Sequence, residues 1–221
     1  MKENKFKAVL FDLDGTLLDT LEDLANSMNV ILKAHGMKTF PANDYKEFLG
    51  LGLEGLIKCV IPDDKFNEEI ADEFLACMRV EYGKRWAEKT RPYPGIPELL
   101  DELQKIGLKL AVLSNKADEY TKVIIAKLLP NWHFHIVRGL TDDYPPKPDP
   151  ASAINIAREL KIKPEDFIYL GDTNIDMQTA NAAGMYAVGV LWGFRTAQEL
   201  KENGAKILIE SPLQVLDLLK L

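Results

Sequence analysis

The chain has 221 residues, of which 47% are hydrophobic and 28% charged, enough for a full α/β core with a small insertion. Its net charge of −7 argues against nucleic acid as a partner but leaves room for a phosphorylated small molecule held by local lysines. No secretory leader or membrane-length apolar run is recognisable, and the two cysteines, Cys59 and Cys77, lack metal-site spacing. We therefore expect a soluble cytoplasmic protein, a monomer or homodimer, with reduced packing cysteines and no membrane partner.

The first predicted strand, Lys7–Phe11, is an apolar run that leads directly into Asp12-Leu13-Asp14-Gly15-Thr16-Leu17. Ligand crevices of α/β proteins lie at the carboxyl ends of strands, so we expect Asp12 and Asp14 in such a crevice. Two buried carboxylates this close repel each other, and a cation, with Mg²⁺ the first choice, would relieve the repulsion. Taken alone, the Asp-Gly pair is also compatible with a plain turn in which Asp14 acts as a cap.

The next segment, from about Leu18 to Arg91, contains apolar residues at helical spacing and no convincing strand. It is short for an independent domain but suits a helical cap inserted into the core. The sequence Arg91-Pro92-Tyr93-Pro94-Gly95 then has the composition of a domain boundary. We predict a catalytic core of residues 1–17 and 92–221 and an α-helical cap of residues 18–91.

Within the predicted cap, the loop Leu49-Gly50-Leu51-Gly52-Leu53 is a candidate for closing over the site and selecting substrates. It is not a dinucleotide-binding fingerprint, because no strand precedes it. Three cap cations are candidate partners for a substrate carboxylate, although a solvated face is the preferred interpretation for all of them: Lys58, Arg79 and Arg85.

Beyond the cap, apolar strands alternate with amphipathic helices such as Ile96–Ile106 and Ala151–Leu160. This alternation predicts an α/β fold with a mainly parallel sheet covered on both faces. The predicted strands are Lys109–Leu113, His133–Val137, Phe167–Leu170, Tyr186–Leu191 and, more weakly, Lys206–Ile209.

Polar residues follow four of these strands, and in a parallel sheet such ends converge on one crevice. Besides the two aspartates, the segments are Ser114-Asn115-Lys116, a four-proline loop around Lys147, and Gly171-Asp172-Thr173-Asn174-Ile175-Asp176. Acids, a hydroxyl and an ammonium group suit phosphoryl transfer, which depends on positioning and electrostatic stabilisation.

Each residue type has a chemical reason to be there. Ser114 can donate its hydroxyl to a phosphate oxygen, and Lys147 supplies a fixed positive charge. Asp12 and Asp172 can hold a hard cation that also binds phosphate oxygens. Asp12 is then a candidate nucleophile, and Asp14 a candidate to protonate the leaving oxygen and later activate water.

In this order, these four segments resemble the motifs of the haloacid dehalogenase superfamily, from residue 7 to about 190. The resemblance implies a Rossmann-like three-layer core with strand order 5-4-1-2-3, strands being numbered along the chain, and a helical cap inserted after the first motif. The site residues that it implies are Asp12 as nucleophile, Asp14 as acid/base, and Thr16, Ser114, Asn115 and Lys147 as phosphate ligands. Magnesium would be held by Asp12, the backbone carbonyl of Asp14, and Asp172, with Asp176 supporting these ligands from behind.

The acid at position 14 favours phosphate-ester cleavage, because dehalogenase-type members lack it. The segment Trp192-Gly193-Phe194-Arg195 is similar to one common in phosphoglycolate phosphatases. We therefore expect a Mg²⁺-dependent phosphatase that hydrolyses a small phosphorylated metabolite, best 2-phosphoglycolate, through an aspartyl phosphate. The alternatives are a β-phosphoglucomutase-type phosphotransferase and a non-catalytic protein that binds a phosphorylated ligand or a partner. Lys116 and Arg195 are expected to be exposed or structural.

Overall fold

The structure is a computed structural model that describes residues 5–219. The chain divides into two compact units, a helical unit of Asp19–Arg91 and a core unit that runs up to Leu18 and resumes at Pro92. The crossings, β2 (Leu18–Asp19) and β3 (Arg91–Pro92), pair as a short two-stranded sheet. Within residues 5–219, no helix combines the length and apolar character of a membrane span.

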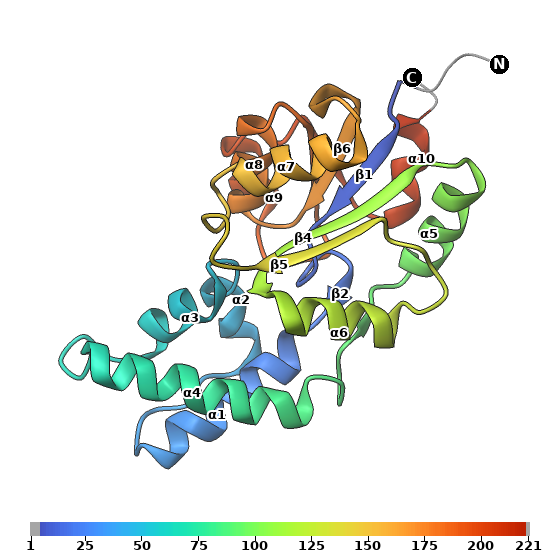
Figure 1. Cartoon of the computed structure of the whole chain (residues 1–221). Coiled ribbons are helices and arrows are strands. Elements are labelled where there is room, and N and C mark those ends of the chain that lie inside the picture. Colours follow the sequence, from blue (N-terminus) through green and yellow to red (C-terminus); the bar gives the residue numbers. More distant parts are fainter. Residues whose placement is uncertain (1–4, 220–221) are drawn as a thin grey trace. The chain divides into compact units, whose positions relative to one another are not determined.

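The described part of the core unit is built on a six-stranded parallel sheet with the order β5-β4-β1-β6-β7-β8 (Figure 1). Its strands are β1 (Ala8–Phe11), β4 (Lys109–Ala117), β5 (Ile136–Leu140), β6 (Phe167–Gly171), β7 (Tyr186–Val190) and β8 (Ile207–Ile209). The central strand is β1, in which Ala8 lies opposite Lys109 of β4 on one side and Phe167 of β6 on the other. The residues that follow β1, β4 and β6 are therefore neighbours at one edge of the sheet.

The predicted α/β class is confirmed, and the five main strands lie in the predicted order. The sheet differs in detail because β8 adds a sixth strand beyond β7. The third predicted strand, His133–Val137, was placed three residues too early, since its pairing with β4 begins at Ile136 opposite Ala111. The second predicted strand ended too early, because β4 continues past Leu113 to Ala117.

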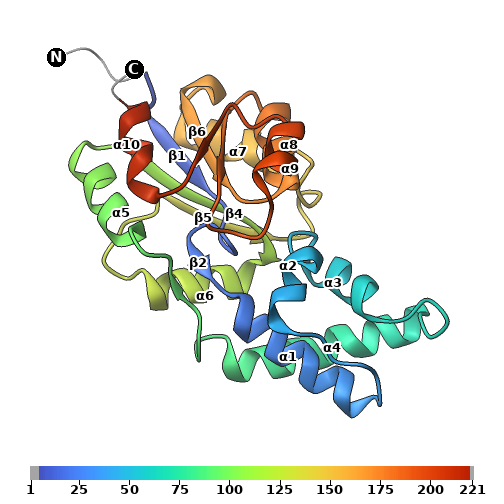
Figure 2. The ribbon, with the colours of Figure 1, turned by 180° about the vertical axis from the view of Figure 1, so that it is seen from behind.

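Helices cover both faces of this sheet, α7, α8 and α9 on one face and α5, α6 and α10 on the other (Figures 1 and 2). Right-handed crossovers explain the division, because the strand order reverses direction after β5. The helices are α5 (Ile96–Lys105), α6 (Asp118–Leu128), α7 (Ala151–Leu160), α8 (Asn174–Ala182), α9 (Ala197–Glu202) and α10 (Val215–Leu218), with 3₁₀ turns η2 (Pro164–Asp166) and η3 (Pro212–Gln214).

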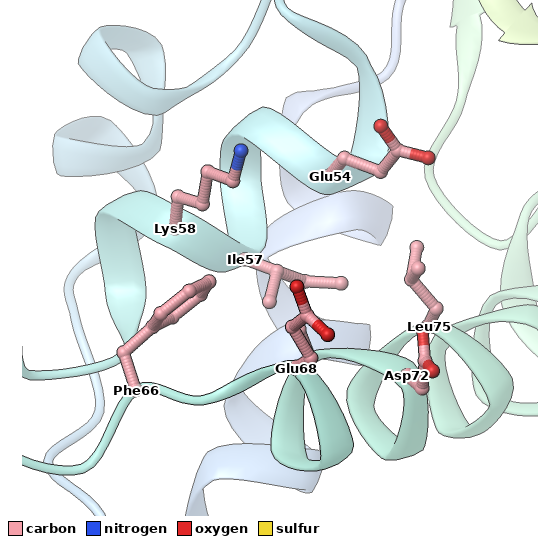
Figure 3. A pocket seen from close by; sticks show the side chains of 8 residues that line it. Glu54, Ile57, Lys58, Phe66, Glu68, Asp72 and Leu75 are labelled. Carbon is pink, nitrogen blue, oxygen red and sulfur yellow. The ribbon is translucent and has the colours of Figure 1, made fainter.

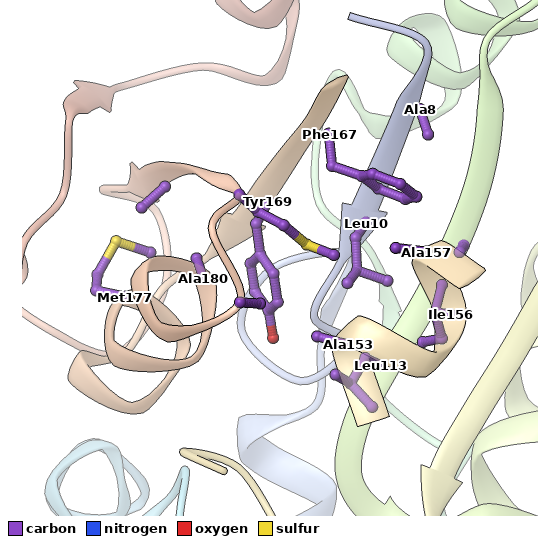
Figure 4. Packing of buried hydrophobic residues seen from close by; sticks show 14 of the residues in the cluster. Ala8, Leu10, Leu113, Ala153, Ile156, Ala157, Phe167, Tyr169, Met177 and Ala180 are labelled. Carbon is purple, nitrogen blue, oxygen red and sulfur yellow. The ribbon is translucent and has the colours of Figure 1, made fainter. Parts of the chain in front are cut away.

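Figure 4 shows the buried cluster between the sheet and its α7–α8 face. Alternate residues of a strand point to the same face, so Ala8 and Leu10 of β1 share this cluster with Ala111 and Leu113 of β4. Small residues of α7 bring that helix close to the sheet, and Tyr169 of β6 points its hydroxyl toward the carboxyl end of the strands. Close packing of this core thus fixes the positions of the strand ends that the polar residues follow.

The helical unit consists of α1 (Leu21–Ala34), η1 (Ala42–Asp44), α2 (Tyr45–Phe48), α3 (Gly52–Val60) and α4 (Glu68–Arg85). The buried Asp23 carboxylate joins the start of α1 to the end of the unit, accepting from the backbone N–H of Thr90 at 2.8 Å and from its hydroxyl at 2.8 Å. Both cysteines are free thiols, but the packing role predicted for Cys59 is wrong, because its side chain is exposed.

Candidate active site

Asp12 stands at the end of β1 between the ends of β4 and β6. Its backbone N–H donates to the Leu170 carbonyl at 2.9 Å, which continues the β1–β6 pairing one residue past the strand. The side chain is buried. The sheet therefore fixes both the position and the desolvation of this carboxylate.

Lys147 reaches Asp12 from the loop that follows β5. Its Nζ lies 2.6 Å from Asp12 Oδ1, 2.7 Å from Asp176 Oδ1 and 3.2 Å from the Leu113 carbonyl, and its side chain is only 4% exposed. The Asn115 side chain holds the loop, accepting from the Lys147 N–H at 2.8 Å and donating to the Lys147 carbonyl at 3.0 Å. One ammonium group is thus shared by two buried carboxylates.

Asp176 is held at the start of α8 by its own capping box. Its Oδ2 accepts from the N–H and the hydroxyl of Thr173 at 3.1 and 2.7 Å. Its Oδ1 accepts from Lys147 and, at 3.3 Å, from the Tyr169 hydroxyl. Four donors fill the acceptor capacity of one carboxylate, so Asp176 is suited to orienting its neighbours.

Asp172, one residue past β6, is held by segments far apart in the chain. Its Oδ1 accepts from the Thr16 hydroxyl at 3.0 Å, and its Oδ2 accepts from the Phe194 N–H at 2.8 Å. Gly15, whose φ is +90°, and Gly193 both lie so close that a Cβ at either position would collide with the Asp172 side chain. These two glycines form a cradle for the carboxylate.

The donor set at this point fits a magnesium ion. Carboxylate oxygens of Asp12, Asp172 and Asp176 lie within 4.8 Å of one another, and hard oxygen ligands are what Mg²⁺ prefers. Asp12 and Asp172 are the better ligands of the three, because the four donors on Asp176 compete with a metal there. The structure thus brings these three aspartates together, while their roles, and that of the Asp14 carbonyl as a metal ligand, remain predictions.

The electrostatics also favour a cation. Burial raises the pKa of the Asp12 carboxyl well above its ordinary value, and the Asp176 carboxylate raises it further. Burial, followed by Asp176, raises the pKa of Asp172 to about 7. Burial alone would lower the pKa of Lys147, but Asp12 and Asp176 outweigh it and raise that pKa. Lys147 therefore stays charged, yet does not compensate all the carboxylates around it.

Asp14 lies beyond this cluster and pairs with a different lysine. The Lys116 Nζ is 3.0 Å from Asp14 Oδ1, and the Lys116 side chain is 9% exposed, so an exposed Lys116 is not what the structure shows. The Ser114 hydroxyl accepts from the Lys116 N–H at 3.1 Å. The core unit thus brings a hydroxyl, an acid and an ammonium group together where β4 continues past the end of β1.

The segment after β7 contributes contacts that the sequence did not identify. Besides Gly193 and Phe194 on Asp172, the Trp192 indole N–H donates to the Thr16 carbonyl at 3.0 Å. Arg195 pairs with Glu199 at 3.1 Å, as a structural residue would. The resemblance of residues 192–195 to a Trp-Gly-aromatic-Arg segment indicated that this stretch was of interest. It did not indicate which atoms of the segment contact the site.

The cap cations predicted for a substrate carboxylate have other surroundings. Lys58 borders an open hollow of about 450 Å³ between α3 and α4, whose other charged residues are Glu54, Glu68 and Asp72 (Figure 3). Arg85 is paired with Glu81 in α4. Three acids around one lysine make this hollow a poor site for an anion.

The family that this fold and site define is that of haloacid dehalogenase-like hydrolases, whose family model matches residues 9–190. The chain belongs to this family, and it is a phosphatase of phosphoric monoesters. It is 34% identical to the phosphoglycolate phosphatase of Nitrosospira multiformis over 93% of this chain and 92% of that one. It is 28% identical to the N-acetylmuramic acid 6-phosphate phosphatase of Pseudomonas aeruginosa over 99% and 97% of the two chains. A crystal structure from Lactobacillus delbrueckii superposes with a TM-score of 0.88 at 28% identity, covering 95% and 96%.

Proposed function

We propose that the protein is a magnesium-dependent phosphatase of 2-phosphoglycolate that works through an aspartyl phosphate on Asp12. The observation that carries the proposal is the cluster in which Lys147 joins Asp12 and Asp176 beside Asp172 at neighbouring strand ends. The substrate is supported by the phosphoglycolate phosphatases among its relatives. The core and cap assignment of the two units is part of the same proposal.

Each step has a residue to perform it. A carboxylate oxygen of Asp12 forms a bond to phosphorus as the bond from phosphorus to the ester oxygen breaks, and Asp14 gives its proton to the leaving oxygen. Asp14 then takes a proton from water as that water attacks the phosphorus, which releases inorganic phosphate and restores Asp12. When bound, Mg²⁺ supplies positive charge against the oxygens of phosphate and carboxylate.

The remaining residues bind and orient. Lys147 fixes the Asp12 carboxylate and offers positive charge to the phosphoryl oxygens. Ser114 supplies its hydroxyl to the phosphate. Thr16 and Asn115, predicted as phosphate ligands, have side chains engaged with Asp172 and with the Lys147 backbone. Because the Thr16 N–H also donates to the Leu13 carbonyl at 3.4 Å, we propose that Thr16 and Asn115 position Asp172 and Lys147 around the phosphate instead of binding it themselves.

The test measures phosphate release with Mg²⁺ from 2-phosphoglycolate, N-acetylmuramic acid 6-phosphate and β-glucose 1-phosphate. We expect the fastest hydrolysis with 2-phosphoglycolate, suppression by EDTA and restoration by added Mg²⁺. Asp12→Asn, a nearly isosteric change, should reduce release to background while leaving the thermal unfolding transition cooperative. A variant that keeps the wild-type rate contradicts the nucleophile. Sugar-phosphate interconversion without phosphate release would instead identify a phosphomutase.

A further inference from the structure

Lys116 brings an ammonium group next to Asp14, the proposed acid/base. Its Nζ is 3.0 Å from Asp14 Oδ1, and the two side chains are mostly buried. Asp14 must reach the ester oxygen of the substrate in order to protonate it. Lys116 therefore faces the leaving group, whereas Lys147 faces the phosphoryl group through Asp12.

The backbone fixes Lys116 in this direction. Residues 114–116 lie in β4 where its register with β5 is irregular, and the contacts show the directions of the side chains: Asn115 meets the Lys147 loop, and Lys116 meets Asp14. The Lys116 N–H donates to the Ser114 hydroxyl at 3.1 Å, and the Thr121 hydroxyl of α6 donates to the Lys116 carbonyl at 3.2 Å. These contacts fix the backbone of Lys116 beside Ser114, and the ion pair with Asp14 then places its ammonium group.

From this placement, and resting on the proposed phosphatase function, we infer that Lys116 selects substrates whose leaving group carries a carboxylate close to the ester oxygen. In a phosphorylated 2-hydroxy acid, the carboxyl carbon is two covalent bonds from the ester oxygen. A leaving group that contacts Asp14 through its ester oxygen therefore brings this carboxylate to the adjoining ammonium group. A charge-assisted hydrogen bond then forms in a largely desolvated place, where it is strongest.

The surroundings of other cations support the same assignment. Two of the three cap cations are less suited to this task, because Lys58 borders a hollow rich in acids and Arg85 is paired with Glu81.

The experiment compares two esters that differ in the charge of the leaving group, 2-phosphoglycolate and 2-hydroxyethyl phosphate, with saturating Mg²⁺. The readout is the ratio of their kcat/KM values. In Lys116→Met we expect this ratio to fall about 10- to 100-fold, mainly through KM for 2-phosphoglycolate, the range of one charge-assisted hydrogen bond. Lys116→Arg should recover most of the ratio. Lys122→Met, which removes an exposed lysine of α6, should retain it.

A structural role of Lys116, acting only through Asp14, would lower kcat for both esters and leave the ratio unchanged, which overturns the inference. A wild-type ratio near one overturns it as well. Lys116→Gln serves as the neutral variant if Lys116→Met does not unfold cooperatively on heating. Failure of the wild-type protein to hydrolyse either ester with Mg²⁺ is a different result, because it refutes the proposed function itself.

Discussion

Replacing Lys147 by Met tests whether one buried ammonium group holds the site together. The substitution keeps a long, flexible and apolar side chain but removes the charge that lies 2.6 Å from Asp12 Oδ1 and 2.7 Å from Asp176 Oδ1. Removing one partner of a buried ion pair costs about 3–5 kcal/mol, because the other charge is left uncompensated. We therefore expect Lys147→Met to lose about that much free energy of unfolding near pH 8 in EDTA.

Lys122→Met is the matched control. The Lys122 Nζ is 2.6 Å from Asp118 Oδ2, the same separation as in the Lys147–Asp12 pair, but its side chain is 59% exposed against 4% for Lys147. Exposed pairs contribute about 0–1 kcal/mol, so this variant should be almost as stable as the wild type. Any large difference between the two variants is then due to burial and to the second carboxylate.

The loss in Lys147→Met should also depend on pH. Because the pKa of Lys147 is raised, the charged ammonium group contributes its full stabilisation at every pH below 10.5. This contribution is therefore constant between pH 5 and pH 8. Burial and Asp176 raise the pKa of Asp12, so its protonated form stabilises the folded state most at low pH, and this contribution disappears as the pH rises from 3.8 through the folded-state value. Without Lys147, Asp12 and Asp172, whose pKa values burial raises, relieve their repulsion by taking up protons as the pH falls. Urea unfolding should therefore show a larger deficit at pH 8; equal deficits for the two lysine variants at pH 8 would refute the reasoning.

Three other outcomes follow from the geometry around the aspartates. Because the pKa of Asp172 is about 7, protons compete with Mg²⁺ for this carboxylate. The apparent affinity of the protein for Mg²⁺ should therefore fall about tenfold for each pH unit below 7. Calorimetric titrations that give equal affinities at pH 6 and pH 8 would contradict this. In Gly193→Ala the new methyl group displaces the Asp172 side chain, so Mg²⁺ affinity and kcat/KM should drop at least about tenfold. Gly83→Ala, at an exposed position inside α4, should leave both unchanged and add up to about 1 kcal/mol of stability. Tyr169→Phe removes one of the four hydrogen-bond donors to Asp176. Urea unfolding of this variant should give a free energy of unfolding about 1 kcal/mol below that of the wild type. Retention of full stability would show that this hydrogen bond contributes nothing.

The sequence predicted that Asp12, Lys147 and Asp172 lie close together, because their proximity follows from a simple rule. Apolar runs separated by helical segments form a parallel sheet, and the carboxyl ends of such strands meet at one edge. The position of β1 between β4 and β6 came from the resemblance, and the register of Ala8 opposite Lys109 and Phe167 then brings the residues after the strands together.

The pairing of Lys116 with Asp14 was missed for a physical reason. Apolar content ends at Leu113, so the strand was predicted to end there, whereas β4 continues to Ala117 with an irregular register. Local sequence does not fix the direction of a side chain in a loop or across such an irregularity, so this pairing was not predictable. The contacts of Gly193 and Phe194 with Asp172 likewise depend on how the chain leaves β7, which no local pattern encodes.

The charges of the site explain why it uses two lysines in different places. Four carboxylates, those of Asp12, Asp14, Asp172 and Asp176, face the two ammonium groups of Lys116 and Lys147, a formal charge of −2. One Mg²⁺ would bring this charge to zero, and a neutral site attracts an anionic substrate only through where its positive charges stand. With Lys147 beside the proposed nucleophile and Lys116 beside the proposed acid, positive charge would stand at both ends of the bond to be cleaved. This separation favours an ester that is anionic at both ends over one whose only charge is its phosphate.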